Sequence, residues 1–116
     1  MIVYRGDTIT KEKLDDYCQA AGNINRYFKW LCFVSTSIDK DIAEIFGTNV
    51  IYKIDLGRYE WNDQFVDISN LSNYPSEKEI LLRPGVRFRV DQVDIDENTS
   101  RAYVHIHVLP SYISTL

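Results

Sequence analysis

Most of this chain is divided into short apolar runs separated by turn residues, a pattern that restricts it to folds rich in β-strands. The clearest example is a pair of runs at residues 86–95 and 102–109, where apolar and polar residues alternate on either side of the polar segment 96–100. An alternation with a period of two is typical of a strand that buries one face. We therefore predict a hairpin there, with Val86, Phe88 and Val90 facing the core.

The remaining runs predict a mixed fold. Residues 2–4, 28–34, 50–54, 65–68 and 79–82 are further β-type runs. Two segments instead have the spacing of an amphipathic helix. The first, residues 10–21, has Leu14, Tyr17, Cys18 and Ala21 on one side and Gly22 as its stop; the second starts after Asp39, carries Ile42, Ile45 and Phe46 on one side, and stops at Gly47. We predict a single α+β domain over residues 1–116, built mainly from antiparallel sheet with two early helices.

Composition excludes two broad classes of function. The chain has a formal net charge of −4, with 17 acidic and 13 basic residues, and the basic residues form no stripe. We therefore expect no nucleic-acid partner. No apolar run approaches the ~20 residues that a membrane-spanning helix needs, and the N-terminus has none of the regions of a signal peptide. The localisation stays open between a cytoplasmic protein and a secreted effector.

The cysteines and histidines do not predict a metal site. Cys18 and Cys32 match no zinc-ligand spacing, so we expect two buried free thiols, with a disulfide as the open alternative. His105 and His107 alternate in a strand and share one face, but no third ligand is placed beside them. We interpret them as exposed strand histidines.

Three short polar motifs follow β-type runs and are the candidates for chemistry: Tyr4-Arg5-Gly6, Ser35-Thr36-Ser37 and Glu77-Lys78-Glu79. In extended chain, residues i and i+2 point to one face, so Glu77 and Glu79 can line one side of a pocket. Paired carboxylates suit a reaction that develops positive charge on a sugar. The alternative interpretation is an ordinary acidic loop end.

The other two motifs each have a ligand-binding and a structural interpretation. Arg5 can hold a phosphate through its planar guanidinium, and Gly6 lets a ligand approach the backbone; the alternative is an arginine in a surface ion pair. Ser35, Thr36 and Ser37 can bind a ligand and orient a carboxylate. Their alternative role is that of a turn and helix-cap segment.

Taken together, the order arginine, Ser-Thr-Ser, Glu-x-Glu resembles the arginine–serine–glutamate clade of mono-ADP-ribosyltransferases. Phe46 and Tyr74 match the aromatic positions of that family in the helix after Ser-Thr-Ser and in the loop before the glutamates. The resemblance implies two packed antiparallel sheets around an NAD cleft, with flanking helices. Members usually carry a helical layer ahead of the arginine strand, and here we expect that layer to be reduced, absent or supplied by another segment.

The resemblance also implies roles for the binding residues. Arg5 would hold an NAD phosphate, and Gly6 would offer backbone hydrogen bonds to the nicotinamide amide. Glu79 would be the indispensable catalytic glutamate, with Ser35 positioning it. Phe46 would stack on nicotinamide, with Thr36 and Ser37 supporting the strand end.

On the acceptor side, the resemblance implies that Glu77 orients a target arginine and accepts its proton, while Tyr74 packs against the incoming protein. The implied activity is transfer of ADP-ribose from NAD to protein arginine, with release of nicotinamide. Two alternatives remain open: an NAD glycohydrolase, in which water replaces arginine, and a catalytically weak module that binds NAD or a protein.

Overall fold

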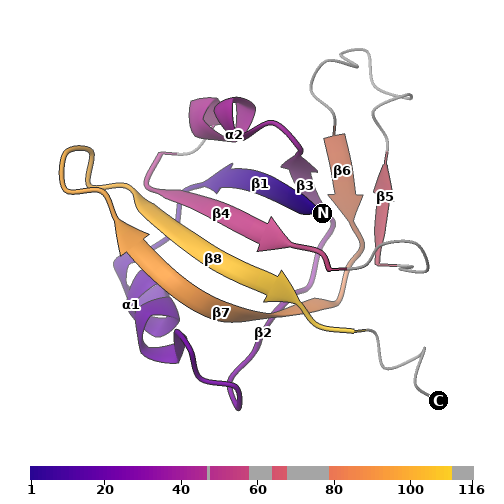
Figure 1. Cartoon of the computed structure of the whole chain (residues 1–116), viewed down its shortest axis with the longest axis horizontal. Helices are drawn as coiled ribbons and strands as arrows, with labels where there is room; N and C mark the ends of the chain where they lie inside the picture. The colour runs from indigo at the N-terminus through magenta and orange to yellow at the C-terminus, as the bar shows by residue number, and fades with distance from the viewer. Residues whose placement is uncertain (47, 58–63, 68–78, 111–116) are drawn as a thin grey trace.

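The structure is a computed structural model that describes residues 1–46, 48–57, 64–67 and 79–110. Within these residues the chain forms two helices, α1 (Lys11–Ala20) and α2 (Lys40–Phe46), and eight strands (Figure 1). The strands are β1 (Ile2–Asp7), β2 (Phe28–Trp30), β3 (Val34–Ser37), β4 (Val50–Asp55), β5 (Phe65–Asp67), β6 (Glu79–Leu82), β7 (Val86–Ile95) and β8 (Ala102–Val108). The α+β class and both early helices are therefore confirmed.

All eight strands belong to one hydrogen-bonded sheet, in the order β2-β7-β8-β4-β1-β3-β6-β5. The expected arrangement of two antiparallel sheets needs two corrections. The pair β4–β8 is parallel, and the two expected sheets are parts of one. The larger part, β2-β7-β8-β4-β1, joins the smaller part, β3-β6-β5, through a single register pair, Tyr4↔Ser37. One pair is a narrow junction, so the two parts can diverge on either side of it.

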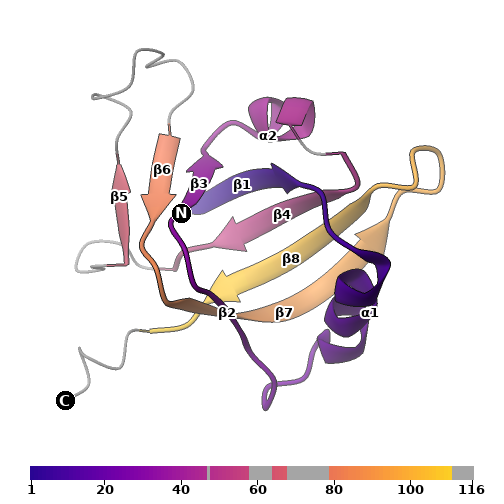
Figure 2. The same ribbon diagram turned by 180° about the vertical axis from the view of Figure 1, so that it is seen from behind.

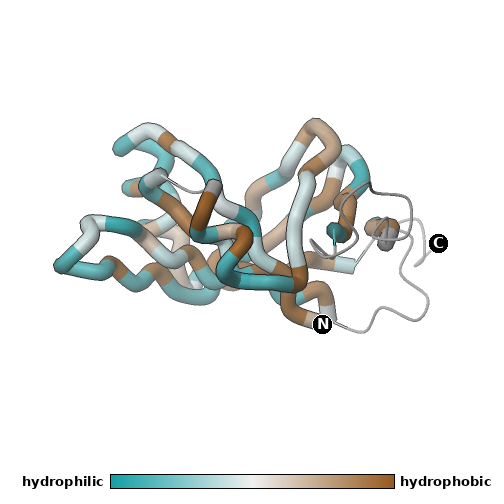
Figure 3. The backbone as a smooth tube through the Cα atoms, turned by 90° about the horizontal axis from the view of Figure 1, so that it is seen from above, coloured by the Kyte–Doolittle hydropathy of each residue, from teal (hydrophilic) through white to brown (hydrophobic). Residues whose placement is uncertain are grey.

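The hairpin predicted from the alternating runs is present. Strands β7 and β8 pair antiparallel from Phe88↔Val108 to Ile95↔Ala102, with a bulge between Val90 and Gln92. Val86, Phe88 and Val90 are buried as expected. In Figure 3 the hydrophilic turn of this hairpin lies at one end of the molecule, away from the hydrophobic segments of the strands.

Helix α1 covers one face of the larger part of the sheet (Figure 2). Its N-terminus is capped by Thr10, whose Oγ1 accepts a hydrogen bond from the Lys13 amide, as a threonine N-cap does. Tyr17 packs from this helix against the rings of Phe28, Tyr52 and Phe88. The core is therefore an aromatic cluster on this face, extended by aliphatic side chains of β1, β4, β6 and β8.

Helix α2 lies on the opposite face. Lys40 at its start stands over the ring of Tyr103 and lines a pocket with Ile51. Successive strand residues point to opposite faces, so Ile51 lies on the other side of β4 from Tyr52, which contacts α1. Asp39 caps α2 as predicted, because its Oδ1 accepts a hydrogen bond from the Asp41 amide. The prediction that Ile45 lies on the apolar, buried side of α2 is wrong, because Ile45 is 76% exposed.

The single strand predicted at residues 28–34 is divided in the structure. Strand β2 pairs with β7 at one edge of the sheet, whereas β3 pairs with β6 and β1. The chain must cross between these places, and residues 31–33 make the crossing with Leu31 and Phe33 exposed. Cys32 lies in the crossing. Cys18 and Cys32 are free, as expected, but both are exposed rather than buried.

None of the helices in the described part of the chain has the length and apolar character needed to cross a membrane.

The hydroxyls of Tyr17 and Tyr52 share a buried hydrogen bond of 2.9 Å. Burial raises the pKa of both phenols above the ordinary value of 10. Below pH 10 both are neutral in the folded and unfolded chain, and their contribution to stability is full. Above pH 10 the unfolded chain loses these protons first, so the free energy of unfolding falls, by about 1.4 kcal/mol per tyrosine per pH unit.

Urea unfolding between pH 9 and 11 measures this loss. The double variant Tyr17→Phe/Tyr52→Phe should lose less stability over the interval than the wild type, and Tyr27→Phe, at an exposed position, should match the wild type. An equal loss in the double variant would contradict the assignment.

Candidate active site

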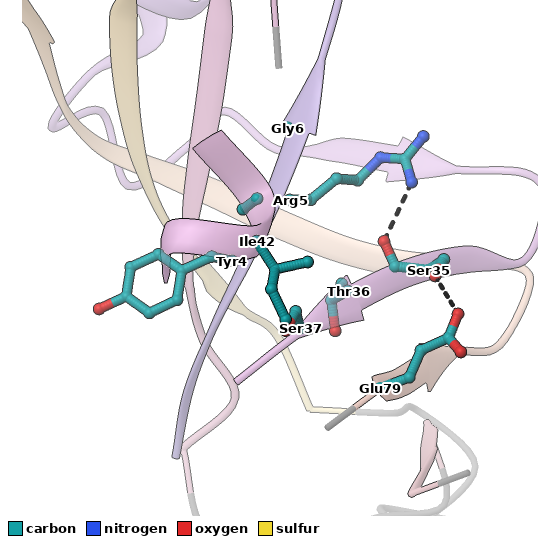
Figure 4. A pocket seen from close by; sticks show the side chains of 9 residues that line it. Tyr4, Arg5, Gly6, Ser35, Thr36, Ser37, Ile42 and Glu79 are labelled. Atoms are coloured by element: carbon teal, nitrogen blue, oxygen red, sulfur yellow. Dashed lines mark hydrogen bonds between the residues drawn. The ribbon is translucent and has the colours of Figure 1, made fainter. Parts of the chain in front are cut away.

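A pocket of about 260 Å³ opens where β1 and β3 separate beyond their single register pair. It is lined by Tyr4, Arg5, Gly6, Ser35, Thr36, Ser37, Ile42, Ala43 and Glu79. The described members of all three sequence motifs therefore meet in one place, although they come from three different strands (Figure 4). Their convergence follows from strand order, because β1, β3 and β6 are neighbours in the sheet.

A direct hydrogen bond joins Ser35 and Glu79 in the pocket. Strands β3 and β6 pair antiparallel with Ser37 opposite Glu79. Ser35 lies two residues from Ser37 and so shares its face, which makes Ser35 and Glu79 a diagonal cross-strand pair. The Ser35 Oγ donates a hydrogen bond of 2.6 Å to Glu79 Oε1. This bond fixes the carboxylate and uses only part of the acceptor capacity of one oxygen.

Arg5 extends from β1 toward the same place (Figure 4). Its Nη1 donates a hydrogen bond of 3.0 Å to the backbone carbonyl of Ser35, and its Nη2 lies 3.5 Å from Asp7 Oδ2. The guanidinium thus spans the gap between β1 and β3. The side chain remains 30% exposed, and a guanidinium has five N–H donors, so donors are left for a ligand in the pocket.

Thr36 and Ser37 have structural contacts. Thr36 is buried, and its Oγ1 donates a hydrogen bond of 2.7 Å to the Ile80 carbonyl, which ties β3 to β6. The Ser37 Oγ accepts a hydrogen bond from the Asp39 amide at 3.0 Å, at the turn between β3 and α2. All three residues line the pocket, but their hydrogen bonds differ: Ser35 holds the carboxylate, Thr36 ties β3 to β6, and Ser37 contributes to the turn.

Ile42 and Ala43 line the pocket but belong to none of the three motifs, and Tyr4 belongs to a motif but was given no role of its own. Ile42 and Ala43 come from α2, which the turn at Ser37 directs back over β1. Tyr4 points away from Arg5, to the other side of β1 (Figure 4). Alternation along β1 would have separated Tyr4 from Arg5, but the position of α2 depends on a turn that periodicity does not report.

Several predicted residues are not tested by this geometry. The backbone of Phe46 belongs to α2, but its side chain lies outside the described part. Tyr74 and Glu77 lie in residues 68–78, also outside it. Their roles remain predictions.

His105 and His107 are each paired with a carboxylate on β7. His105 Nε2 lies 2.9 Å from Asp94 Oδ2, and His107 Nδ1 lies 2.7 Å from Asp91 Oδ1. The side chains are about a third exposed. Among the described residues, no three His, Cys, Asp or Glu side chains gather as metal ligands would.

The arrangement defines a site in which a carboxylate is oriented by a serine beside an arginine. Residues 1–110 match the sequence description of the ADP-ribosyltransferase exoenzyme family. The chain is also 30% identical over 106 residues to Mav of Mycobacterium avium (strain 104), to which an NAD(+)–arginine ADP-ribosyltransferase activity is attributed. That alignment covers 90% of this chain and 12% of Mav. The chain belongs to the ADP-ribosyltransferase exoenzyme family.

Solved structures share the fold. HopU1, an ADP-ribosyltransferase of Pseudomonas syringae pv. tomato DC3000, superposes with a TM-score of 0.75 at 23% identity, over 93% of this chain and 45% of that one. The Vibrio splendidus toxin Vis, in complex with agmatine, gives 0.75 at 19%, over 97% and 50%. Exoenzyme S of Pseudomonas aeruginosa, bound to human 14-3-3 protein beta and carba-NAD, gives 0.68 at 22%, over 92% and 47%. The chain thus spans half or less of the length of each of these relatives.

The different contacts of Ser35 and Thr36 predict that their substitutions have unequal effects on stability. Thr36→Val removes a buried donor and leaves the Ile80 carbonyl without it, so the free energy of unfolding should fall by about 1–3 kcal/mol. Ser35→Ala, at an exposed position, should change it by less than about 0.5 kcal/mol. Urea unfolding at neutral pH measures both, and a cost at Ser35 equal to that at Thr36 would contradict the prediction.

Proposed function

We propose that this chain binds NAD and transfers its ADP-ribose to arginine side chains of proteins, releasing nicotinamide. The observation that carries the proposal is the linkage of Arg5, Ser35 and Glu79 in one pocket, through hydrogen bonds of 3.0 Å and 2.6 Å. Membership of the ADP-ribosyltransferase exoenzyme family supports it.

The pocket fits the nicotinamide end of NAD in its donors and its size. Arg5 keeps free N–H donors at the exposed side of the guanidinium, where a phosphate can pair with it. Gly6 follows Arg5 on β1 and lines the pocket, so its backbone can approach a flat amide. A volume of about 260 Å³ lies below the roughly 300–1,000 Å³ of sites that bury a drug-sized ligand. We therefore assign this pocket to one end of the dinucleotide.

Glu79 is the residue that we assign to the chemistry. Loss of nicotinamide leaves positive charge on the ribose, and a fixed carboxylate stabilises that charge as it develops. The hydrogen bond from Ser35 holds the carboxylate in place before the reaction, so little reorganisation is needed. The second oxygen, Oε2, is then available to accept a hydrogen bond from a ribose hydroxyl.

The acceptor is assigned to arginine on the basis of Glu77 and of the relatives. The name of Mav includes arginine as its target, and Vis is seen with agmatine, which carries a guanidinium. A guanidinium has a pKa of roughly 12.5–13.8 and is a poor nucleophile when protonated. A carboxylate such as Glu77 can orient one of its nitrogens and accept the proton as the new bond to the ribose forms.

The first test is nicotinamide release from NAD by Glu79→Gln. The amide keeps the shape of the side chain but removes its charge, so release should fall by about 10²–10³-fold. Glu97→Gln, in the turn between β7 and β8, is the matched control and should keep wild-type turnover. Retention of more than half of the activity by folded Glu79→Gln would overturn the assignment. A wild type that is folded and binds NAD without releasing nicotinamide would favour the binding-module alternative.

The second test separates transfer from hydrolysis. With agmatine as acceptor, Glu77→Gln should reduce ADP-ribosyl-agmatine formation by about 10²-fold or more, while hydrolysis of NAD to free ADP-ribose changes little, because water needs no orientation by this carboxylate. Mass spectrometry of both products gives the ratio. An equal loss of both reactions would contradict an acceptor role for Glu77, and hydrolysis alone in the wild type would identify a glycohydrolase.

A further inference from the structure

A second pocket, of about 250 Å³, lies on the face of β1 and β4 opposite Arg5 and the aromatic core. It is lined by Tyr4, Lys40, Ile51, Lys53, Asp94, Tyr103 and His105. The registers explain this set: Tyr4 pairs with Lys53, Ile51 with Tyr103, and Lys53 with His105. The side chains therefore stand in two adjacent rows on one face of β1, β4 and β8, with Ile51 buried beneath them and Lys40 of α2 at the side.

Two lysines contribute positive charge to this pocket. Lys53 forms no ion pair with any residue in the described ranges, and its side chain is exposed. Lys40 stands 5.5 Å from the centroid of the Tyr103 ring, and its ion pair is a long one, 3.7 Å to Glu44 one helical turn away. Exposed pairs of this kind contribute little, so Lys40 is available to a ligand.

Asp94, the carboxylate in the pocket, is already engaged. Gln92 Nε2 lies 2.7 Å from its Oδ1 and 2.9 Å from its Oδ2, and His105 lies 2.9 Å from Oδ2. These contacts hold the pKa of Asp94 below its usual value, chiefly through Gln92. The carboxylate therefore stays ionised with Gln92 and His105 and makes no ion pair with either lysine. Asp55, two residues from Lys53 on the same face of β4, accepts a hydrogen bond from the Gly57 amide instead.

We propose that this pocket is a binding site for the phosphoryl group of a small ligand, separate from the candidate active site. A phosphoryl group carries about −1.5 to −2 charge and three strong acceptor oxygens. Lysine ammonium groups bind it as point charges, and Tyr4 and Tyr103 also line the pocket. The assignment rests on the charges and hydrogen bonds of this face and does not depend on the proposed transferase activity.

The two pockets share one residue and one helix. Tyr4 lines both, and α2 contributes Lys40 to this pocket and Ile42 and Ala43 to the other. A bound phosphate would therefore contact two elements, β1 and α2, that also form the candidate active site.

The test is a calorimetric titration with inorganic pyrophosphate at constant ionic strength. Because Arg5 is itself assigned to a phosphate, the titration is made in an Arg5→Gln background, which removes binding at the candidate active site. We expect saturable binding of pyrophosphate to the Arg5→Gln variant. Adding Lys53→Gln should lower that affinity at least about tenfold, because a hydrogen bond to a charged group contributes more free energy than a tenfold change in affinity requires. Adding Lys29→Gln instead, in β2 and outside the pocket, should leave the affinity unchanged.

Titrations with inorganic phosphate and with adenosine diphosphate distinguish a free anion from a phosphate carried by a nucleotide. Tighter binding of either ligand, with the same dependence on Lys53, supports the site. Absence of saturable binding in Arg5→Gln would overturn the proposal. So would equal weakening by Lys53→Gln and Lys29→Gln, because that result would reflect general charge. Backbone amide NMR spectra check that each variant is folded, and shifts at Tyr103 and His105 should accompany binding.

Discussion

The position of the candidate active site depends on the short pairing between β1 and β3, which consists of a single register pair. A continuous ladder between these strands would bring their backbones together and close the space between them. One register pair, Tyr4↔Ser37, instead holds the two parts of the sheet together, and beyond it the strands separate. The pocket with Arg5, Ser35 and Glu79 occupies that opening. Backbone polar groups exposed by such a separation need other partners, and the Arg5 guanidinium supplies one by donating to the Ser35 carbonyl.

The same constraint places each side chain of the junction on a definite face. Along β1, Arg5 points to the opening and Tyr4 to the opposite side, where α2 and the lysines lie. Along β3, Ser35 faces Glu79 whereas Thr36 is buried and bonded to the Ile80 carbonyl. Both proposed sites therefore rest on the alternation of strand side chains about one narrow junction, next to the buried core to which the hairpin β7–β8 and helix α1 contribute.

Elements with a strong local pattern were predicted from sequence nearly to the residue. The hairpin at residues 86–109 needed only its alternation and a polar turn, and α1 needed only its helical spacing and the stop at Gly22. Some predictions that depended on distant partners were wrong. Residues 28–34 read as one buried strand, but β2 and β3 pair at different places in the sheet. Ile45 and Cys18 have apolar neighbours at helical spacing, yet both are exposed, because periodicity identifies a possible face without saying what covers it.

By itself the sequence determined which chemical groups this protein has at its strand ends: a guanidinium followed by glycine, a serine motif and a glutamate, in an order that resembles one enzyme family. The pairing of Ser35 with Glu79 was implied only by the resemblance, and nothing in the sequence indicated that Arg5 bonds to a backbone carbonyl or that Ile42 and Ala43 join the pocket. Those contacts join residues about 30–45 positions apart in the chain. Strand order, register and the turn into α2 decide them, since local propensity carries no information about which distant strand becomes the neighbour.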